Sequence, residues 1–335
     1  MAEPTARAAR RRGARLLAAS LALLAVVAAI AALAPGGRAP RAGAAGPPGP
    51  ARAASAAVPE ADGERALALV ETLCAFGPRA PGTPGHEKAL AFLSARLRAT
   101  ADAVRIDPFA IQAPGGVVVR ATNLVAQFRP ELADRILVGA HWDTRPRADR
   151  DPDPARREEP IVGANDGGSG TALLLALAEA MEKTPPPVGV DLVLFDAEDW
   201  GREGDLANYC LGSRRFAASL GSAALPRAAL VIDMVGDADL AIRKESVSST
   251  AAPGLVESLW RIARDEGADA FLHERAVQIF DDHVPLIQAG IPAALLIDLE
   301  YDAWHTHADL PDKLSAASLA QVGRVVFAWV YSGAP

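Results

Sequence analysis

Three carboxylates gather in the stretch "LFDAEDWG", residues 194–201, directly after an apolar run. Asp196, Glu198 and Asp199 fall within four residues of one another. Acids that follow a strand often cap the next helix or lie in a solvated turn. Carboxylates can also move protons or bind a cation. The stretch alone leaves both interpretations open, and only residues elsewhere in the chain can distinguish them.

Several other predicted strands also end in an acid or an imidazole. Residues at or just beyond these ends are His141, Asp143, Asp166, Asp233 and His305. Ligands of open α/β sheets bind beyond the carboxyl ends of the strands. Carboxylates brought together there repel one another and are costly to desolvate, and a cation at the centre removes that repulsion. Histidine and carboxylate ligands without thiolate suit zinc, which in catalytic sites has three protein ligands and an open position.

The apolar periodicity of the chain predicts the elements that position these residues. We expect helices at residues 63–77, 85–101, 167–183, 212–220, 254–267, 281–290 and 315–331, and strands at 117–128, 135–143, 188–199, 227–237 and 291–299. Strands that alternate with helices predict an α/β fold with a mostly parallel sheet. Residues 62–335 are enough for one large catalytic domain.

The N-terminal part of the chain has a different character. Residues 1–15 are basic, residues 16–34 are uncharged and apolar, and residues 35–61 form a linker rich in Pro, Ala and Gly. About 20 apolar residues cross a bilayer, and the preceding arginines predict a cytoplasmic N-terminus with an exported, periplasmic or otherwise extracytoplasmic remainder. Signal peptide and inner-membrane anchor are both open. The length of the run favours an uncleaved anchor, which would tie the protein to the membrane.

The remaining composition excludes some classes of function. The formal net charge is −7 and no basic stripe is present, which argues against nucleic acid as a partner. Cys74 and Cys210 are the only cysteines, and their separation does not establish a disulfide. We expect Cys74 to pack as a small core residue, and His86 and His273 to be solvated.

The order of the motifs resembles the zinc aminopeptidase clan and, within it, the zinc-dependent glutaminyl cyclases, the animal-type and bacterial glutaminyl-peptide cyclotransferases. The motifs that carry this resemblance are "GAHWDTRP", "GANDGGSGTALLLALAEA", "LFDAEDWG", "LGSRRFA", "VIDMVGD", "DDHVPL" and "WHTHAD". Together they cover roughly residues 63–333. The resemblance implies a three-layer α/β sandwich, in which helices flank a mixed, mostly parallel sheet.

The resemblance also implies a role for each residue of the site. It implies zinc ligands at Asp166, Asp199 and His305, with Glu198 as the general acid and base. Many relatives have Glu where Asp199 stands, and the shorter side chain requires a closer backbone. Further residues implied are Asp233 and Asp281 as a hydrogen-bonded catalytic support, Trp304 as a wall of the substrate pocket, and Trp200 as a second part of that wall.

The number of metal ions separates the two activities of the clan. Its aminopeptidases bind a second zinc through the equivalents of His141, Asp166 and Asp233. An acid at Asp281 close to Asp233 would share a proton with it, since two carboxylates in contact cannot both stay ionised cheaply. We therefore favour one zinc per chain, with His141 held by hydrogen bonds and Asp143 orienting it. The motif "DDH" could instead only cap its helix.

The predicted function is that of a glutaminyl-peptide cyclotransferase, an acyltransferase. It would convert the free N-terminal glutamine of a peptide or protein into pyroglutamate and release ammonia. Two alternatives stay open. One is a zinc aminopeptidase that binds two zincs, and the other is a catalytically inactive binding domain on the same fold.

Overall fold

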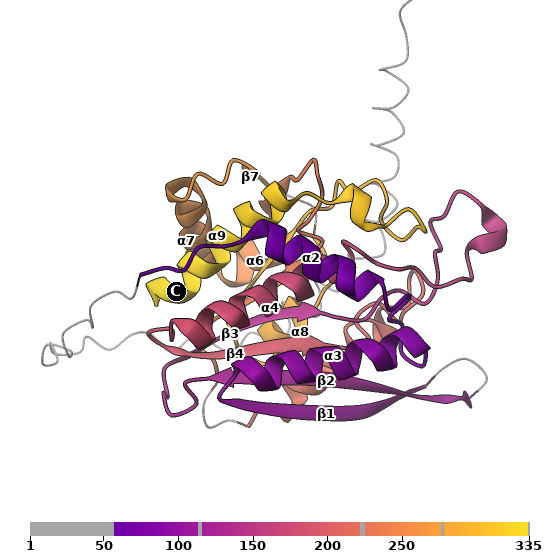
Figure 1. Ribbon diagram of the computed structural model, residues 1–335, viewed down its shortest axis with the longest axis horizontal. Helices are drawn as coiled ribbons and strands as arrows, with labels where there is room; N and C mark the ends of the chain where they lie inside the picture. The colour runs from indigo at the N-terminus through magenta and orange to yellow at the C-terminus, as the bar shows by residue number, and fades with distance from the viewer. Residues whose placement is uncertain (1–56, 113–115, 222–224, 276–277, 334–335) are drawn as a thin grey trace, which may run out of the picture. The chain divides into compact units, whose positions relative to one another are not determined.

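The computed structural model describes residues 57–112, 116–221, 225–275 and 278–333 (Figure 1). The predicted basic segment 1–15, the apolar segment 16–34 and most of the linker 35–61 lie outside the described residues. Among the described helices, none has the length and apolar character that a membrane crossing requires.

A six-stranded mixed sheet forms the centre of the fold, in the order β1-β2-β4-β3-β5-β8. The strands are β1 (Ala103–Gln112), β2 (Val118–Phe128), β3 (Arg135–His141), β4 (Gly189–Phe195), β5 (Ala229–Asp233) and β8 (Ala293–Ile297). The last four run parallel to one another, whereas β2 is antiparallel to both β1 and β4. The predicted mixed, mostly parallel sheet is confirmed.

Helices cover both faces of this sheet. The longer helices are α2 (Gly63–Cys74), α3 (Pro84–Thr100), α4 (Gly168–Lys183), α7 (Pro253–Asp265) and α9 (Ala316–Ser332), and the shorter ones are α5 (Leu211–Ser219), α6 (Ser246–Ala251) and α8 (His283–Gln288). In Figure 1, α2, α4 and α9 lie together along the sheet. The longer helices share one apolar cluster with one face of the sheet, and α5 and α8 share a second cluster with the other face.

Alternation along the strands explains this three-layer arrangement. In β5, Leu230 and Ile232 belong to the first cluster, and Val231 between them belongs to the second. Successive side chains of a strand point to opposite faces, so a strand that is apolar throughout is buried on both sides. The continuous apolar runs of the sequence therefore mark the central strands of a sandwich, as predicted.

Four elements were not anticipated from the sequence. They are β1, the helix α6, and a small two-stranded parallel sheet of β6 (Ile242–Lys244) and β7 (Phe271–Arg275). Strand β1 lies at the edge of the main sheet and is largely exposed. Its sequence therefore mixes charge, Pro108 and isolated apolar residues, which hides the period of two.

The start of α4 lies against the strand ends that carry the predicted site. Gly167 precedes the helix with φ 77°, a backbone conformation that favours glycine. A Cβ atom on Gly170 would lie 2.5 Å from the carbonyl oxygen of Ile232 in β5. The glycines of "NDGGSG" thus let the helix approach the sheet closely, and this approach brings Asp166 to the ends of β3 and β5.

Substitution of Gly170 tests this close approach. Gly170→Ala should lower the free energy of unfolding by about 1–3 kcal/mol, because the added methyl group meets backbone that cannot move freely. Gly254 is a matched control, since a Cβ there meets nothing within 4 Å. Urea unfolding of the two variants should show a loss for the first and no loss for the second. Equal stabilities would show that α4 does not depend on this contact.

Candidate active site

The strand ends bring five titratable residues into two groups that share Asp166. One group is His141, Asp166 and Asp233, and the other is Asp166, Asp199 and His305. All five residues are buried, and within each group the candidate ligand atoms lie within 4.8 Å of one another. We call these groups the His141 trio and the His305 trio.

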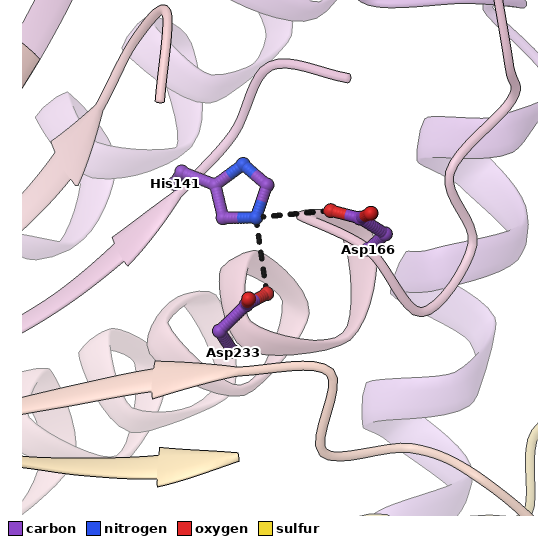
Figure 2. Close-up of side chains that lie close together, drawn as sticks. All are labelled: His141, Asp166 and Asp233. Atoms are coloured by element: carbon purple, nitrogen blue, oxygen red, sulfur yellow. Dashed lines mark hydrogen bonds and ion pairs between the residues drawn. The ribbon is translucent and has the colours of Figure 1, made fainter. Parts of the chain in front are cut away.

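Figure 2 shows the His141 trio. His141 Nε2 lies 3.0 Å from Asp233 Oδ1 and 3.3 Å from Asp166 Oδ1. The contact with Asp233 has the geometry of a hydrogen bond. The predicted proximity of these three residues is therefore present, and the imidazole nitrogen already has an acceptor.

The His305 trio has the character of a metal site. His305 Nε2 lies 3.3 Å from Asp199 Oδ2 and 3.5 Å from Asp166 Oδ2. Both of these carboxylate oxygens are buried without a hydrogen-bond partner among the described residues. Buried carboxylate oxygens are normally hydrogen-bonded, paired or bound to a metal. Two carboxylates and one imidazole, with no thiolate, fit the ligand set of a catalytic zinc.

Asp309 positions the Asp166 loop. Its carboxylate accepts hydrogen bonds from the backbone N–H groups of Asn165 at 2.8 Å and Asp166 at 3.1 Å. Tyr301 donates to the same carboxyl at 2.7 Å. Burial and the nearby Asp166 raise the pKa of Asp309 to about 7. A carboxyl beyond β8 therefore fixes the backbone of Asp166, a predicted ligand that precedes α4.

Asp143 holds the acidic turn at residues 196–199. Its carboxylate accepts from the backbone N–H of Glu198 at 3.1 Å and from that of Asp199 at 3.4 Å. Its Oδ1 also lies 3.4 Å from Nδ1 of His141, but this ring nitrogen makes no hydrogen bond among the described residues, so the orienting role of Asp143 stays a prediction. One carboxylate therefore links the end of β3 to the turn after β4.

Asp196 and His86 form the other support of this turn. Asp196 accepts from the backbone N–H of Ala197 and, at 2.8 Å, contacts His86 Nε2. Ala197 has φ 57°, an unusual conformation for a residue with a side chain. His86 is buried and stacks on Trp142 with ring centroids 4.4 Å apart. The prediction that His86 is solvated was wrong, because its partner follows it by more than a hundred residues and no local pattern reveals it.

Arg145 neutralises Asp199, one of the predicted metal ligands. Its guanidinium donates to Asp199 Oδ1 and, at 3.0 Å, to the hydroxyl of Tyr209. Burial opposes ionisation of Asp199, but Arg145 and His305 outweigh it and lower the pKa of Asp199 to about 2. Asp199 is therefore anionic at neutral pH, as a metal ligand must be.

Glu198 is held in a different state beside it. Burial, together with Asp199 and Asp281, raises the pKa of Glu198 well above its ordinary value. Burial and the charge of Asp233 likewise raise the pKa of Asp281 to about 7. Neighbouring carboxyls whose pKa values are shifted by burial and by one another are typical of functional sites.

The two tryptophans occupy different surroundings. Trp304 is half-buried, and its ring centroid lies 4.3 Å from that of His305, with the Arg150 guanidinium 4.2 Å from the ring centroid. Trp200 is half-buried and packs in a small apolar cluster with Ile111 and Ala197. Trp304 thus lies next to the His305 trio, and a place for either ring in a substrate pocket stays a prediction.

The remaining histidines and cysteines can also be placed. His273 is exposed as expected, whereas His283 is buried, with its Nε2 atom 3.3 Å from Glu245 Oε2. Cys74 and Cys210 are both free thiols, and Cys74 packs against the main core as expected.

Three contributors were missed from the sequence, namely Arg145, Asp309 and Cys210. Arg145 lies within the motif "GAHWDTRP", Asp309 lies within "WHTHAD", and Cys210 directly precedes "LGSRRFA". Their closeness to these motifs was the only sequence signal that could have pointed to them.

The fold and the His305 trio define a class: α/β proteins with a zinc-type site at the carboxyl edge of a mixed sheet. Residues 123–330 match the model of Peptidase family M28, and the chain belongs to this family.

Its relatives fall into two kinds. The mouse glutaminyl-peptide cyclotransferase-like protein is 26% identical, over 74% of this chain and 70% of its own. The structure of Bacteroides thetaiotaomicron glutaminyl cyclase bound to N-acetylhistamine is 32% identical with a TM-score of 0.79, and the match covers 82% of this chain and 99% of that one. A leucine aminopeptidase precursor from the same organism is also 32% identical, with a TM-score of 0.80 and the same coverage. Overall likeness therefore fits both activities.

Removal of Asp199 tests the His305 trio. Asp199→Ala should lower the affinity for zinc by more than about 100-fold, since even partners of metal ligands contribute 10- to 100-fold. Asp265→Ala, on the exposed surface of α7, is the control and should bind zinc like the parent protein. Competition with a chelator of known affinity measures both. Unchanged zinc affinity in Asp199→Ala would remove this residue from the ligand set.

Proposed function

We propose that this protein is a zinc-dependent glutaminyl-peptide cyclotransferase, which converts the N-terminal glutamine of a peptide into pyroglutamate and releases ammonia. The observation that carries this choice is the hydrogen bond between His141 and Asp233. It engages the Nε2 atom of His141, whereas the carboxylate oxygens of Asp166 and Asp199 that face His305 make no hydrogen bond among the described residues. The relatives that are glutaminyl cyclases support the same choice.

Asp166, Asp199 and His305 would hold the zinc ion. When bound, zinc supplies Lewis acidity that polarises the side-chain carbonyl of the substrate glutamine. The protein positions these ligands before the metal arrives, because Asp309 fixes the backbone of Asp166 and Arg145 fixes Asp199.

Glu198 would carry the proton. The free α-amine of the substrate attacks the side-chain carbonyl carbon and forms a new C–N bond, while the bond to the amide nitrogen breaks. Glu198 accepts the proton that the amine loses and delivers it to the departing nitrogen, which leaves as ammonia. The raised pKa of Glu198 suits a group that must both accept and release a proton.

The substrate itself supplies the nucleophile in this reaction. Holding the amine beside the carbonyl carbon makes the step intramolecular, which can lower a barrier by about 7–11 kcal/mol. Trp304 and Trp200 would line the pocket and keep water from the reacting carbon. The exclusion of water matters because a peptidase with the same fold uses water as its nucleophile.

One zinc per chain follows from the state of the His141 trio. Asp233 is hydrogen-bonded to His141. After burial, the charge of Asp233 is the largest cause of the raised pKa of Asp281. We propose that this network replaces the second metal of the aminopeptidases.

An aminopeptidase is the second candidate, and one observation favours it. The candidate ligand atoms of the His141 trio lie close enough together to share an ion. If that trio bound a second zinc, water would be the expected nucleophile, and the products would change accordingly.

The location of the enzyme is also a proposal. The basic residues 1–15 followed by the apolar residues 16–34 favour export of the catalytic domain across the cytoplasmic membrane. Its substrates would then be peptides outside the cytoplasm.

The products separate the two candidate reactions. A Gln-Ala-Ala peptide should lose ammonia and keep its three residues, and a Leu-Ala-Ala peptide should stay intact. Mass spectrometry of both peptide mixtures measures the outcome. Free leucine from the Leu-Ala-Ala peptide, without ammonia from the Gln-Ala-Ala peptide, would establish the peptidase instead.

Substitution of Glu198 tests its role as the proton carrier. Glu198→Gln, which keeps the shape of the side chain but cannot accept a proton, should lower turnover by about 10²- to 10⁴-fold.

Metal stoichiometry tests the role of Asp233. Elemental analysis of the purified protein should find one zinc per chain, and Asp233→Asn should retain it, because Asp233 is engaged by His141 rather than by metal. Two zincs in the parent protein, with one lost in Asp233→Asn, would show that the His141 trio is a metal site.

A further inference from the structure

Cys210 lies directly against the proposed proton carrier. Its backbone N–H donates to the carbonyl oxygen of Glu198 at 2.8 Å, and the next residue, Leu211, donates to that of Ala197 at 3.1 Å. These two hydrogen bonds attach the start of α5 to the acidic turn. Cys210 itself is fully buried.

The thiol of Cys210 makes a second contact with the same residue. Its Sγ atom lies 3.1 Å from Glu198 Oε1. Within the described part of the chain, no other group donates a hydrogen bond to this carboxyl. Cys210 therefore holds Glu198 at two points, once through the backbone and once through the side chain.

The position of the thiol is set by the surrounding backbone. Cys210 has φ 56°, in the left-handed region that residues with side chains rarely adopt. Gly212 packs so tightly on the turn that a Cβ there would lie 2.4 Å from the carbonyl oxygen of Asp196. Asn123 ties the two segments together, since its Nδ2 donates to the Gly212 carbonyl and its Oδ1 accepts from the Asp196 N–H. Strained conformations held by their surroundings in this way cluster at functional sites.

We propose that Cys210 is a positioning residue, whose thiol keeps the Glu198 carboxyl oriented for proton transfer. This inference rests on the proposed role of Glu198 but holds for either candidate reaction, because both need that carboxyl. A glutamate side chain loses considerable freedom when it is fixed, so a built-in partner pre-organises it.

The thiol is placed to orient the carboxyl. Its S–H group is a weak hydrogen-bond donor, and its Sγ atom lies 3.1 Å from Glu198 Oε1. Burial, together with Glu198 and Asp282, raises the pKa of the Cys210 thiol well above its ordinary value, so the proton needed for donation is retained.

Substitution of Cys210 provides the test, with steady-state kinetics on the Gln-Ala-Ala peptide. Cys210→Ala should lower kcat about tenfold, leave KM within about twofold and leave zinc content unchanged. Cys210→Ser, which keeps a donor, should recover kcat to within about threefold of the parent protein. Cys74→Ala is the matched control and should have no effect. If the Ala variant misfolds, Cys210→Gly replaces it, because glycine suits the left-handed backbone and also lacks the donor.

A double-mutant cycle distinguishes positioning from a general structural role. In the Glu198→Gln background, Cys210→Ala should cause no further loss of turnover, because its target has already been removed. A normal kcat in Cys210→Ala, an equal loss in the Ser and Ala variants, or an additive loss in the double variant would overturn the proposal. If the parent protein cleaves the Leu-Ala-Ala peptide instead, the proposed function fails, and the same variants assayed on that peptide still decide the role of Cys210.

Discussion

The structure is organised around carboxyl groups buried together at the carboxyl edge of the sheet. Within the described residues, Asp166 and Asp199 each place beside His305 a buried oxygen that makes no hydrogen bond. Such an arrangement is costly unless a cation completes it. The surrounding structure opposes its collapse, because Asp309 and Asp143 hold the backbone of the two ligands and Arg145 holds one of the carboxylates.

Both glutaminyl cyclases and aminopeptidases share this fold, and in our proposal the difference between them lies in what His141 does. In a two-metal peptidase its ring would bind an ion, whereas here its Nε2 atom is engaged by Asp233. Overall likeness does not separate these cases, since a glutaminyl cyclase and an aminopeptidase precursor match the chain equally well. The protonation and contacts of a few side chains, rather than the fold, would therefore select the reaction.

Much of the fold and of the site was accessible from the sequence. Runs such as "RILVGAH" are apolar enough to predict buried parallel strands. Because parallel strands bring their carboxyl ends together, the proximity of His141, Asp166 and Asp233 could be predicted. Contacts that depend on partners distant in the sequence could not be predicted. His86 looked like a polar residue at a helix start, and its buried partner is Asp196, which directly follows β4. The contact of Cys210 with Glu198 depends on a turn with left-handed residues, which no periodicity encodes.

The position of the metal tests the central claim most directly. Anomalous diffraction at the zinc edge, from crystals of the zinc-loaded protein, locates each ion independently of any activity. We expect a single peak bounded by Asp166, Asp199 and His305, with the hydrogen bond between His141 and Asp233 intact. A second peak of comparable height within the His141 trio would contradict it.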